Sequence, residues 1–256
     1  MNKWFRVTAA AVLLLKCSVC VAVPTIVVTK AARTAVLKGT KLLVQHGDEV
    51  LFHIDDFSKA SGVVLREALE GVSDVRVFAK IASTRFPAEV SERSIYRLGL
   101  VADDLAKIPG AKAVMRLLVA ENRANVKGAL GELELAAFLV RRKDVVVKSM
   151  REVVETGIGK TDIDIVFTYK SIPINLERKA IDNLRLTDDL RIKIDKMAEL
   201  AKTRGSVPVL AAGEIPPNSS LLDYATSKGV IVTYGGYLHQ CHMIQDAMER
   251  TVLAAK

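Results

Sequence analysis

The sequence predicts an α/β protein in which a sheet-containing part follows a mainly helical region. Two observations lead to this prediction. Residues 162–169 and 174–180 alternate apolar and polar side chains with the period of two that a half-buried strand has. Helical and extended segments then follow one another towards the C-terminus. The 256 residues are 50% hydrophobic, which is enough for one large domain or two small ones.

Residues 1–22 are typical of a secretory signal peptide, with a basic start, a short apolar core and small residues near Cys20 and Ala22. Cleavage after Ala22 would make the protein secreted or periplasmic. One alternative is a membrane anchor over residues 7–28, which would bring membrane contact, although Lys16 in its middle weakens it. The other is a hydrophobic helix of a cytoplasmic protein.

Residues 23–122 form the mainly helical region, in which we recognise no group of residues that suggests a chemical activity. The expected elements are helices over 29–46, from Asp56 or Ser58 to Glu70, over 92–107 and over 111–124, and a short strand over 49–54. Pro109-Gly110 separates the last two helices.

Residues 123–256 predict an α/β domain in the order α-β-β-β-α-β-α-β-α. The helices are expected over 127–142, over 187–202 with Thr187 or Asp188 as cap, over 220–227 and from Leu238 onward. The strands are expected over 144–148, 162–169, 174–180, 207–212 and 230–234. A four-residue turn over 170–173 joins the second and third strands.

The polar faces of these two strands carry the candidate site. If they pair as an antiparallel hairpin with Tyr169 opposite Ile174, Asp164 lies opposite Lys179, and Glu177 lies diagonal to Asp164. Moving the register by two residues keeps the same faces together. We therefore expect Asp164, Glu177 and Lys179 to converge.

Two converging carboxylates repel each other unless a cation lies between them. Oxygen ligands in this number suit Mg²⁺ or Mn²⁺, with water completing the shell. A neighbouring lysine can act on a water molecule or stabilise charge on a phosphate. This combination is what phosphodiester hydrolysis requires. The alternative to a functional site is a solvated hairpin face with an exposed ion pair, which stabilises the protein little.

The segments Asp162-Ile-Asp164-Ile-Val-Phe and Glu177-Arg-Lys179 together resemble the PD-(D/E)xK motif of the restriction-endonuclease-like nucleases, with Thr161 in place of the proline. The resemblance covers about residues 123–240. It implies a restriction-endonuclease-like core, a mixed sheet flanked by helices.

The resemblance also implies roles for individual residues. Asp164 and Glu177 would bind the metal together with the backbone carbonyl of Arg178, and Lys179 would act on the attacking water. Glu132 on the preceding helix would be a further metal ligand, and Asp162 an accessory one. Glu134 is the less favoured glutamate of that helix.

The resulting hypothesis is a Mg²⁺- or Mn²⁺-dependent endonuclease that acts on DNA or RNA, and an exported nuclease or toxin if the leader is cleaved. A formal charge of +8 suits a nucleic-acid partner. The basic residues Arg185, Arg191, Lys193 and Lys196 form either a solvated helix face or a contact to the nucleic-acid backbone. The alternative function is a non-catalytic module that keeps the fold and binds nucleic acid or protein.

Overall fold

The computed structural model describes residues 65, 69 and 72–254. The predicted leader, the helix over 29–46, the strand over 49–54 and most of the helix ending at Glu70 lie outside these residues. Among the described residues, no helix is long and apolar enough to span a membrane.

The described helices are α5 (Val75–Arg85), α6 (Glu92–Gly99), α7 (Ala102–Lys107), α8 (Ala111–Leu117), α9 (Arg123–Val140), α10 (Asp188–Arg204), α11 (Ser219–Ser227) and α12 (Tyr237–Ala254). The strands are β1 (Val145–Val154), β2 (Thr161–Tyr169), β3 (Ile172–Arg178), β4 (Val207–Ala211) and β5 (Ile231–Thr233). From α9 onward the order of elements is the predicted one.

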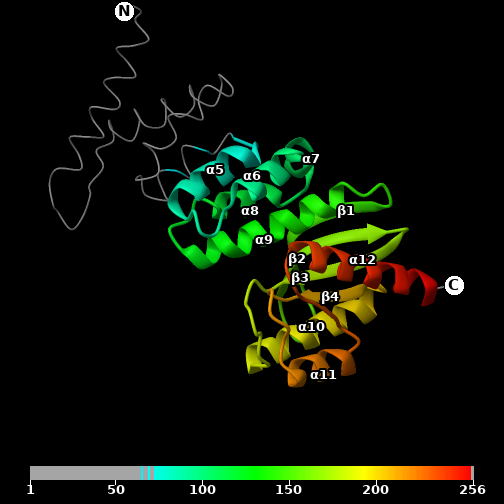
Figure 1. Ribbon diagram of the computed structural model, residues 1–256. Helices are drawn as coiled ribbons and strands as arrows, with labels where there is room; N and C mark the ends of the chain where they lie inside the picture. The colour runs from blue at the N-terminus through cyan, green and yellow to red at the C-terminus, as the bar shows by residue number, and fades with distance from the viewer. Residues whose placement is uncertain (1–64, 66–68, 70–71, 255–256) are drawn as a thin grey trace, which may run out of the picture.

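The five strands form one mixed sheet in the order β1-β2-β3-β4-β5. The pairs β1–β2 and β2–β3 are antiparallel, whereas β3–β4 and β4–β5 are parallel. Helices cover both faces (Figure 1): α9 and α12 lie on one side, with α5–α8 beyond α9, and α10 and α11 lie on the other. The protein is thus an α/β protein with a mixed sheet between helical layers.

Helices α5–α8 share a hydrophobic core with the sheet. Phe78 and Met115 from this region belong to the same buried cluster as Phe167 of β2 and Leu176 of β3. Gly110 shows how close the contact is, because a Cβ atom there would lie 1.9 Å from the carbonyl oxygen of Met150. The described part of the predicted helical region therefore packs directly on β1.

Local signals explain where the helical predictions were wrong. The helix expected over 92–107 is divided into α6 and α7, because Gly99 is a weak helix former and Val101 has a non-helical φ of −133° and ψ of 21°. The helix expected over 111–124 ends at Leu117. Helix α9 begins four residues before the expected start because the Asn122 side chain caps it, accepting the Ala124 N–H at 2.8 Å.

The strand predictions needed two corrections. The strand expected over 144–148 continues as β1 to Val154, because the pairing register shifts between Val147 and Ser149 and breaks the alternation visible in the sequence. The turn is a two-residue one: Tyr169 pairs with Ile172, and both Lys170 and Ser171 have positive φ, 47° and 70°. Such turns usually carry Asn-Gly, so Lys-Ser gave no signal for one.

Candidate functional site

The site lies at a fork in the sheet, where β2 and β3 part. Their pairing runs from Tyr169 opposite Ile172 to Ile165 opposite Leu176. Beyond this point β2 continues to pair with β1 as far as Thr161, and β3 stays with β4 as far as Arg178. Backbone polar groups at the fork therefore need partners other than the sheet ladder.

Asp164 and Glu177 stand at the fork, one on each strand. Each directly follows the last paired residues on the fork side, Asp164 next to Ile165 and Glu177 next to Leu176, so by count the two carboxylates correspond to each other and Lys179 corresponds to Asp162. The predicted pairing of Asp164 with Lys179 was wrong by two residues, because the turn is two residues shorter than expected. The predicted shared face does not change, since a shift of two preserves it.

Both carboxylates are buried, with 6% of Asp164 and 3% of Glu177 exposed. Asp164 accepts the backbone N–H of Arg178 at 2.6 Å, which gives a partner to a donor at the fork. Burial, followed by the charges of Glu177 and Glu132, raises the pKa of Asp164 from 3.8 to about 8. The charge of Glu177, which is the repulsion expected from the sequence, therefore adds to burial in raising this pKa.

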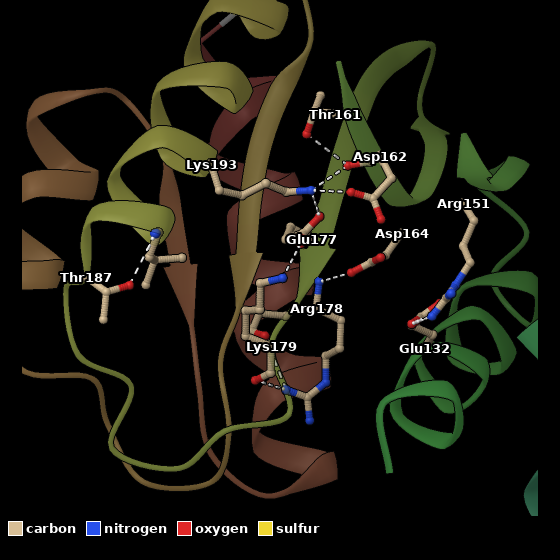
Figure 2. A network of polar contacts seen from close by, with 12 residues as sticks. Glu132, Arg151, Thr161, Asp162, Asp164, Glu177, Arg178, Lys179, Thr187 and Lys193 are labelled. Carbon is tan, nitrogen blue, oxygen red and sulfur yellow. Dashed lines mark hydrogen bonds and ion pairs between the residues drawn. The ribbon is translucent and has the colours of Figure 1, made fainter. Parts of the chain in front are cut away.

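Two lysines neutralise Glu177 (Figure 2). The Nζ atom of Lys179 lies 2.7 Å from Glu177 Oε1, and that of Lys193 lies 2.8 Å from Oε2. Lys193, which comes from α10, also donates to the carbonyl oxygen of Asp162 at 2.6 Å and to Asp162 Oδ1 at 2.9 Å. Lys193 thus bridges the two strands across the fork.

Asp162 differs from Asp164 in its surroundings. Its side chain is 58% exposed, and it pairs with Lys193. Burial acts to raise the pKa of Asp162, but the hydrogen bond and charge of Lys193 outweigh it and lower the pKa. Of the two aspartates, Asp164 therefore belongs to the buried centre of the site and Asp162 to its rim.

Glu132 of α9 also reaches the site. It is 4% exposed, and its charge is one of the causes of the raised pKa of Asp164. Its two oxygens accept hydrogen bonds from Arg151 of β1, Oε2 from Nε at 3.0 Å and Oε1 from Nη2 at 2.7 Å. Glu134, by contrast, pairs with Arg97.

Arg178 has a structural role, as its position in the strand alternation predicts. Its Nη1 donates to the carbonyl oxygens of Lys179, Ala211 and Ala212, at 2.9, 3.2 and 2.5 Å. Burial lowers the pKa of this guanidinium group. The side chain thereby ties the end of β3 to β4, which holds Glu177 and Lys179 in place.

Sequence reasoning missed Arg151 and misjudged Lys193. Arg151 lies beyond the predicted end of its strand. Lys193 was grouped with a solvated or nucleic-acid-binding helix face, yet its side chain is only 14% exposed. Lys193 lies three residues after Leu190 and four before Met197, and this spacing places it on the same side of α10 as these two apolar residues.

The donor set fits a hard divalent cation. Asp164 and Glu177 are two buried oxygen donors on neighbouring strands whose repulsion such a cation would relieve. In the described part of the chain, no group of three or more His, Cys, Asp or Glu side chains could hold a metal ion. Mg²⁺ commonly keeps several water ligands and takes only one or two carboxylates from the protein, so two carboxylates suffice for it.

Fold and site together define an α/β protein with a buried acid–lysine cluster at the fork of a mixed sheet. The chain matches no protein-family model and no curated protein. Among solved structures it is similar to Can2 from Sulfobacillus thermosulfidooxidans, determined in complex with cyclic tetra-adenylate. The TM-score is 0.34 and the identity 12%, over 69% of this chain and 62% of that one, so the chain spans less than two thirds of the Can2 chain.

Proposed function

We propose that this chain is a nuclease that hydrolyses phosphodiester bonds of DNA or RNA, with Mg²⁺ or Mn²⁺ as cofactor. The observation that carries the proposal is the buried pair of Asp164 and Glu177 at the fork, with Lys179 ion-paired to Glu177. Burying two carboxylates side by side costs stability, which the raised pKa of Asp164 reflects. Such a cost is typical of functional sites.

Asp164 and Glu177 would hold the cation. When bound, it would polarise a phosphoryl oxygen and make water a stronger nucleophile. The Arg178 N–H, 2.6 Å from Asp164 Oδ2, orients one carboxylate, and the two lysines orient the other. Rigid supports of this kind keep the donors in position without reorganisation during the reaction.

Lys179 is the residue placed to act on the reacting groups. Its side chain is 35% exposed, whereas Glu177 beside it is almost fully buried. Its Nζ can donate to a water molecule or to a phosphate oxygen from the rim of the site. Water attack forms a new P–O bond, the bond to the sugar oxygen breaks, and the proton that water gives up is balanced by the one that the leaving oxygen takes up.

The test is incubation of the purified protein with DNA and with RNA in Mg²⁺, in Mn²⁺ and in chelator. We expect cleavage only with a divalent cation, and a loss of at least about 100-fold in E177Q and K179M. The variant K228M is the matched control, because Lys228, directly after α11, pairs with Asp195 of α10 outside this cluster. Cleavage that survives both site variants, or that ignores the chelator, contradicts the proposal.

A non-catalytic binding module is the second candidate. The observation in its favour is that lysines already pair with both oxygens of Glu177. This candidate predicts binding of nucleic acid or protein that is indifferent to Mg²⁺ and to chelator, with no cleavage under any of these conditions. The same incubation therefore separates the two candidates.

We further propose that the protein acts outside the cytoplasm after removal of residues 1–22. The support is the basic and apolar pattern of that segment. N-terminal sequencing of the native protein tests this proposal, with Val23 as the expected first residue. An intact Met1 on the native protein would contradict cleavage.

A further inference from the structure

We propose that Arg151 binds a phosphate group of the nucleic-acid substrate beside Asp164 and Glu177, and that Glu132 positions it. This inference rests on the proposed nuclease function and names a residue that engages the substrate backbone. It also gives Glu132 a task other than direct metal binding.

The position of Arg151 in β1 places it beside the site. In the register of β1 with β2, Met150 pairs with Ile165 and Glu152 with Ile163, so Arg151 lies opposite Asp164. Arg151 has a φ of +52°, a left-handed conformation that is unfavourable for a residue with a side chain. A residue keeps such a conformation only where its surroundings impose it, and strain of this kind concentrates at functional sites.

The contacts of Arg151 leave part of its guanidinium free for a ligand. Nε and Nη2 donate to the two oxygens of Glu132. A guanidinium has five N–H donors, and the other three, on Nη1 and Nη2, make no hydrogen bond to the described part of the chain. The Arg151 side chain is 36% exposed, whereas that of Glu132 is 5% exposed. Glu132 therefore binds the buried edge of the Arg151 guanidinium, and the opposite edge of the guanidinium faces solvent.

The surroundings of Arg151 keep its side chain charged. The hydrogen bonds that Arg151 donates to Glu132 raise the pKa of Arg151, and the charges of Glu132, Asp164 and Asp162 act in the same direction against its burial. Arg151 is thus held as a fixed cation next to the carboxylates that would bind metal. A planar guanidinium matches the oxygens of a phosphate, which gives both attraction and orientation.

The position of Arg151 complements that of Lys193. In Figure 2 the two cations stand on opposite sides of the Asp164–Glu177 pair, Lys193 from α10 and Arg151 from β1. Lys193 is occupied with Glu177 and Asp162. Arg151 therefore still has donors for a phosphate, whereas Lys193 has three partners already.

Glu132 has the properties of a positioning residue. Both of its oxygens are engaged by Arg151, and burial, its largest influence, raises the pKa of Glu132 although Arg151 offsets part of the effect. Without Arg151 this carboxylate would be buried and unpaired, which is costly. The pair behaves as one unit, so substitutions of its members should not be additive.

The experiment is equilibrium binding of a short fluorescein-labelled oligonucleotide, as DNA and as RNA, in EDTA so that no cleavage occurs. We expect R151M to bind about 10-fold more weakly, with a salt dependence reduced by about one phosphate contact. The matched control is R204M, because Arg204 pairs with Glu152, the neighbour of Arg151 on β1. That variant should keep wild-type affinity.

The double variant E132Q/R151M removes the buried charge together with its partner, so it remains informative if R151M does not fold. We expect E132Q alone to weaken binding and to have no further effect once Arg151 is replaced, the result that a merely structural role would not produce. If wild type binds and R151M or the double variant matches its affinity and salt dependence, the inference is overturned while the nuclease proposal stands. If wild type neither binds nor cleaves, the proposed function fails and the inference with it.

Discussion

Replacing Asp164 by Asn should change how stability depends on pH. The amide has nearly the same shape as the carboxyl group and can still accept the Arg178 N–H. The folded pKa of Asp164 is about 8, well above its ordinary value of 3.8. A group with a raised folded pKa contributes stability that is complete below the unfolded pKa and is lost as the pH rises through the folded pKa.

The size of this effect follows from the difference between the folded and unfolded pKa values of Asp164. As the pH rises from 5 to 9, it passes through about three pH units in which the unfolded carboxyl group is ionised and the folded one is protonated. At about 1.4 kcal/mol per unit, the wild type loses about 4 kcal/mol of unfolding free energy that D164N keeps. Asp164 is 6% exposed, so solvent screens little of this effect.

The assay is urea unfolding followed by circular dichroism, at a series of pH values and with divalent ions chelated. The difference in unfolding free energy between D164N and wild type should grow with pH. D162N is the matched control on the same strand, because the lowered pKa of Asp162 gives it the opposite sign: its charge stabilises the protein at neutral and alkaline pH. Parallel curves for D164N and wild type would refute the reasoning.

Three further predictions concern Lys193, the turn between β2 and β3, and metal binding. K193M should lower the unfolding free energy by about 3 kcal/mol in urea unfolding, because it leaves the buried Glu177 short of one partner; an effect under about 0.5 kcal/mol would show that the bridge is unimportant. The double substitution K170N/S171G should raise the unfolding free energy by about 1 kcal/mol, and with it the melting temperature, since both positions have positive φ; a lower melting temperature would contradict this. Mg²⁺ binding at pH 7 should release about one proton, because Asp164 is protonated beforehand; calorimetry in buffers of different ionisation enthalpy measures it, and no proton release would contradict it.

Much of the site could be predicted from the sequence because strand alternation has a period of two. Asp164, Glu177 and Lys179 could be assigned to one face without knowing the turn, and the error of two residues in register left that face unchanged. The order of elements from α9 to α12 could be predicted because helices and strands differ in the periodicity of their apolar residues, and a cap residue precedes α9, α10 and α11.

What could not be predicted depends on tertiary structure. Arg151 reaches the site through an irregular strand and a left-handed backbone conformation, and neither has a local sequence signature. Lys193 is inward-facing because the fork offers it Glu177 and the carbonyl oxygen of Asp162. The two-residue turn is formed by Lys170 and Ser171 against their conformational preference, so the packing of β2 and β3 outweighs local propensity there.

The central claim is that Asp164 and Glu177 share one divalent cation. A crystal grown with Mn²⁺, measured for anomalous scattering of that ion, tests it most directly. The account predicts an anomalous peak within coordinating distance of both carboxylates, with Lys179 beside it. The absence of a peak at the fork, with Lys193 still on Glu177 and Mn²⁺ in excess, would contradict it.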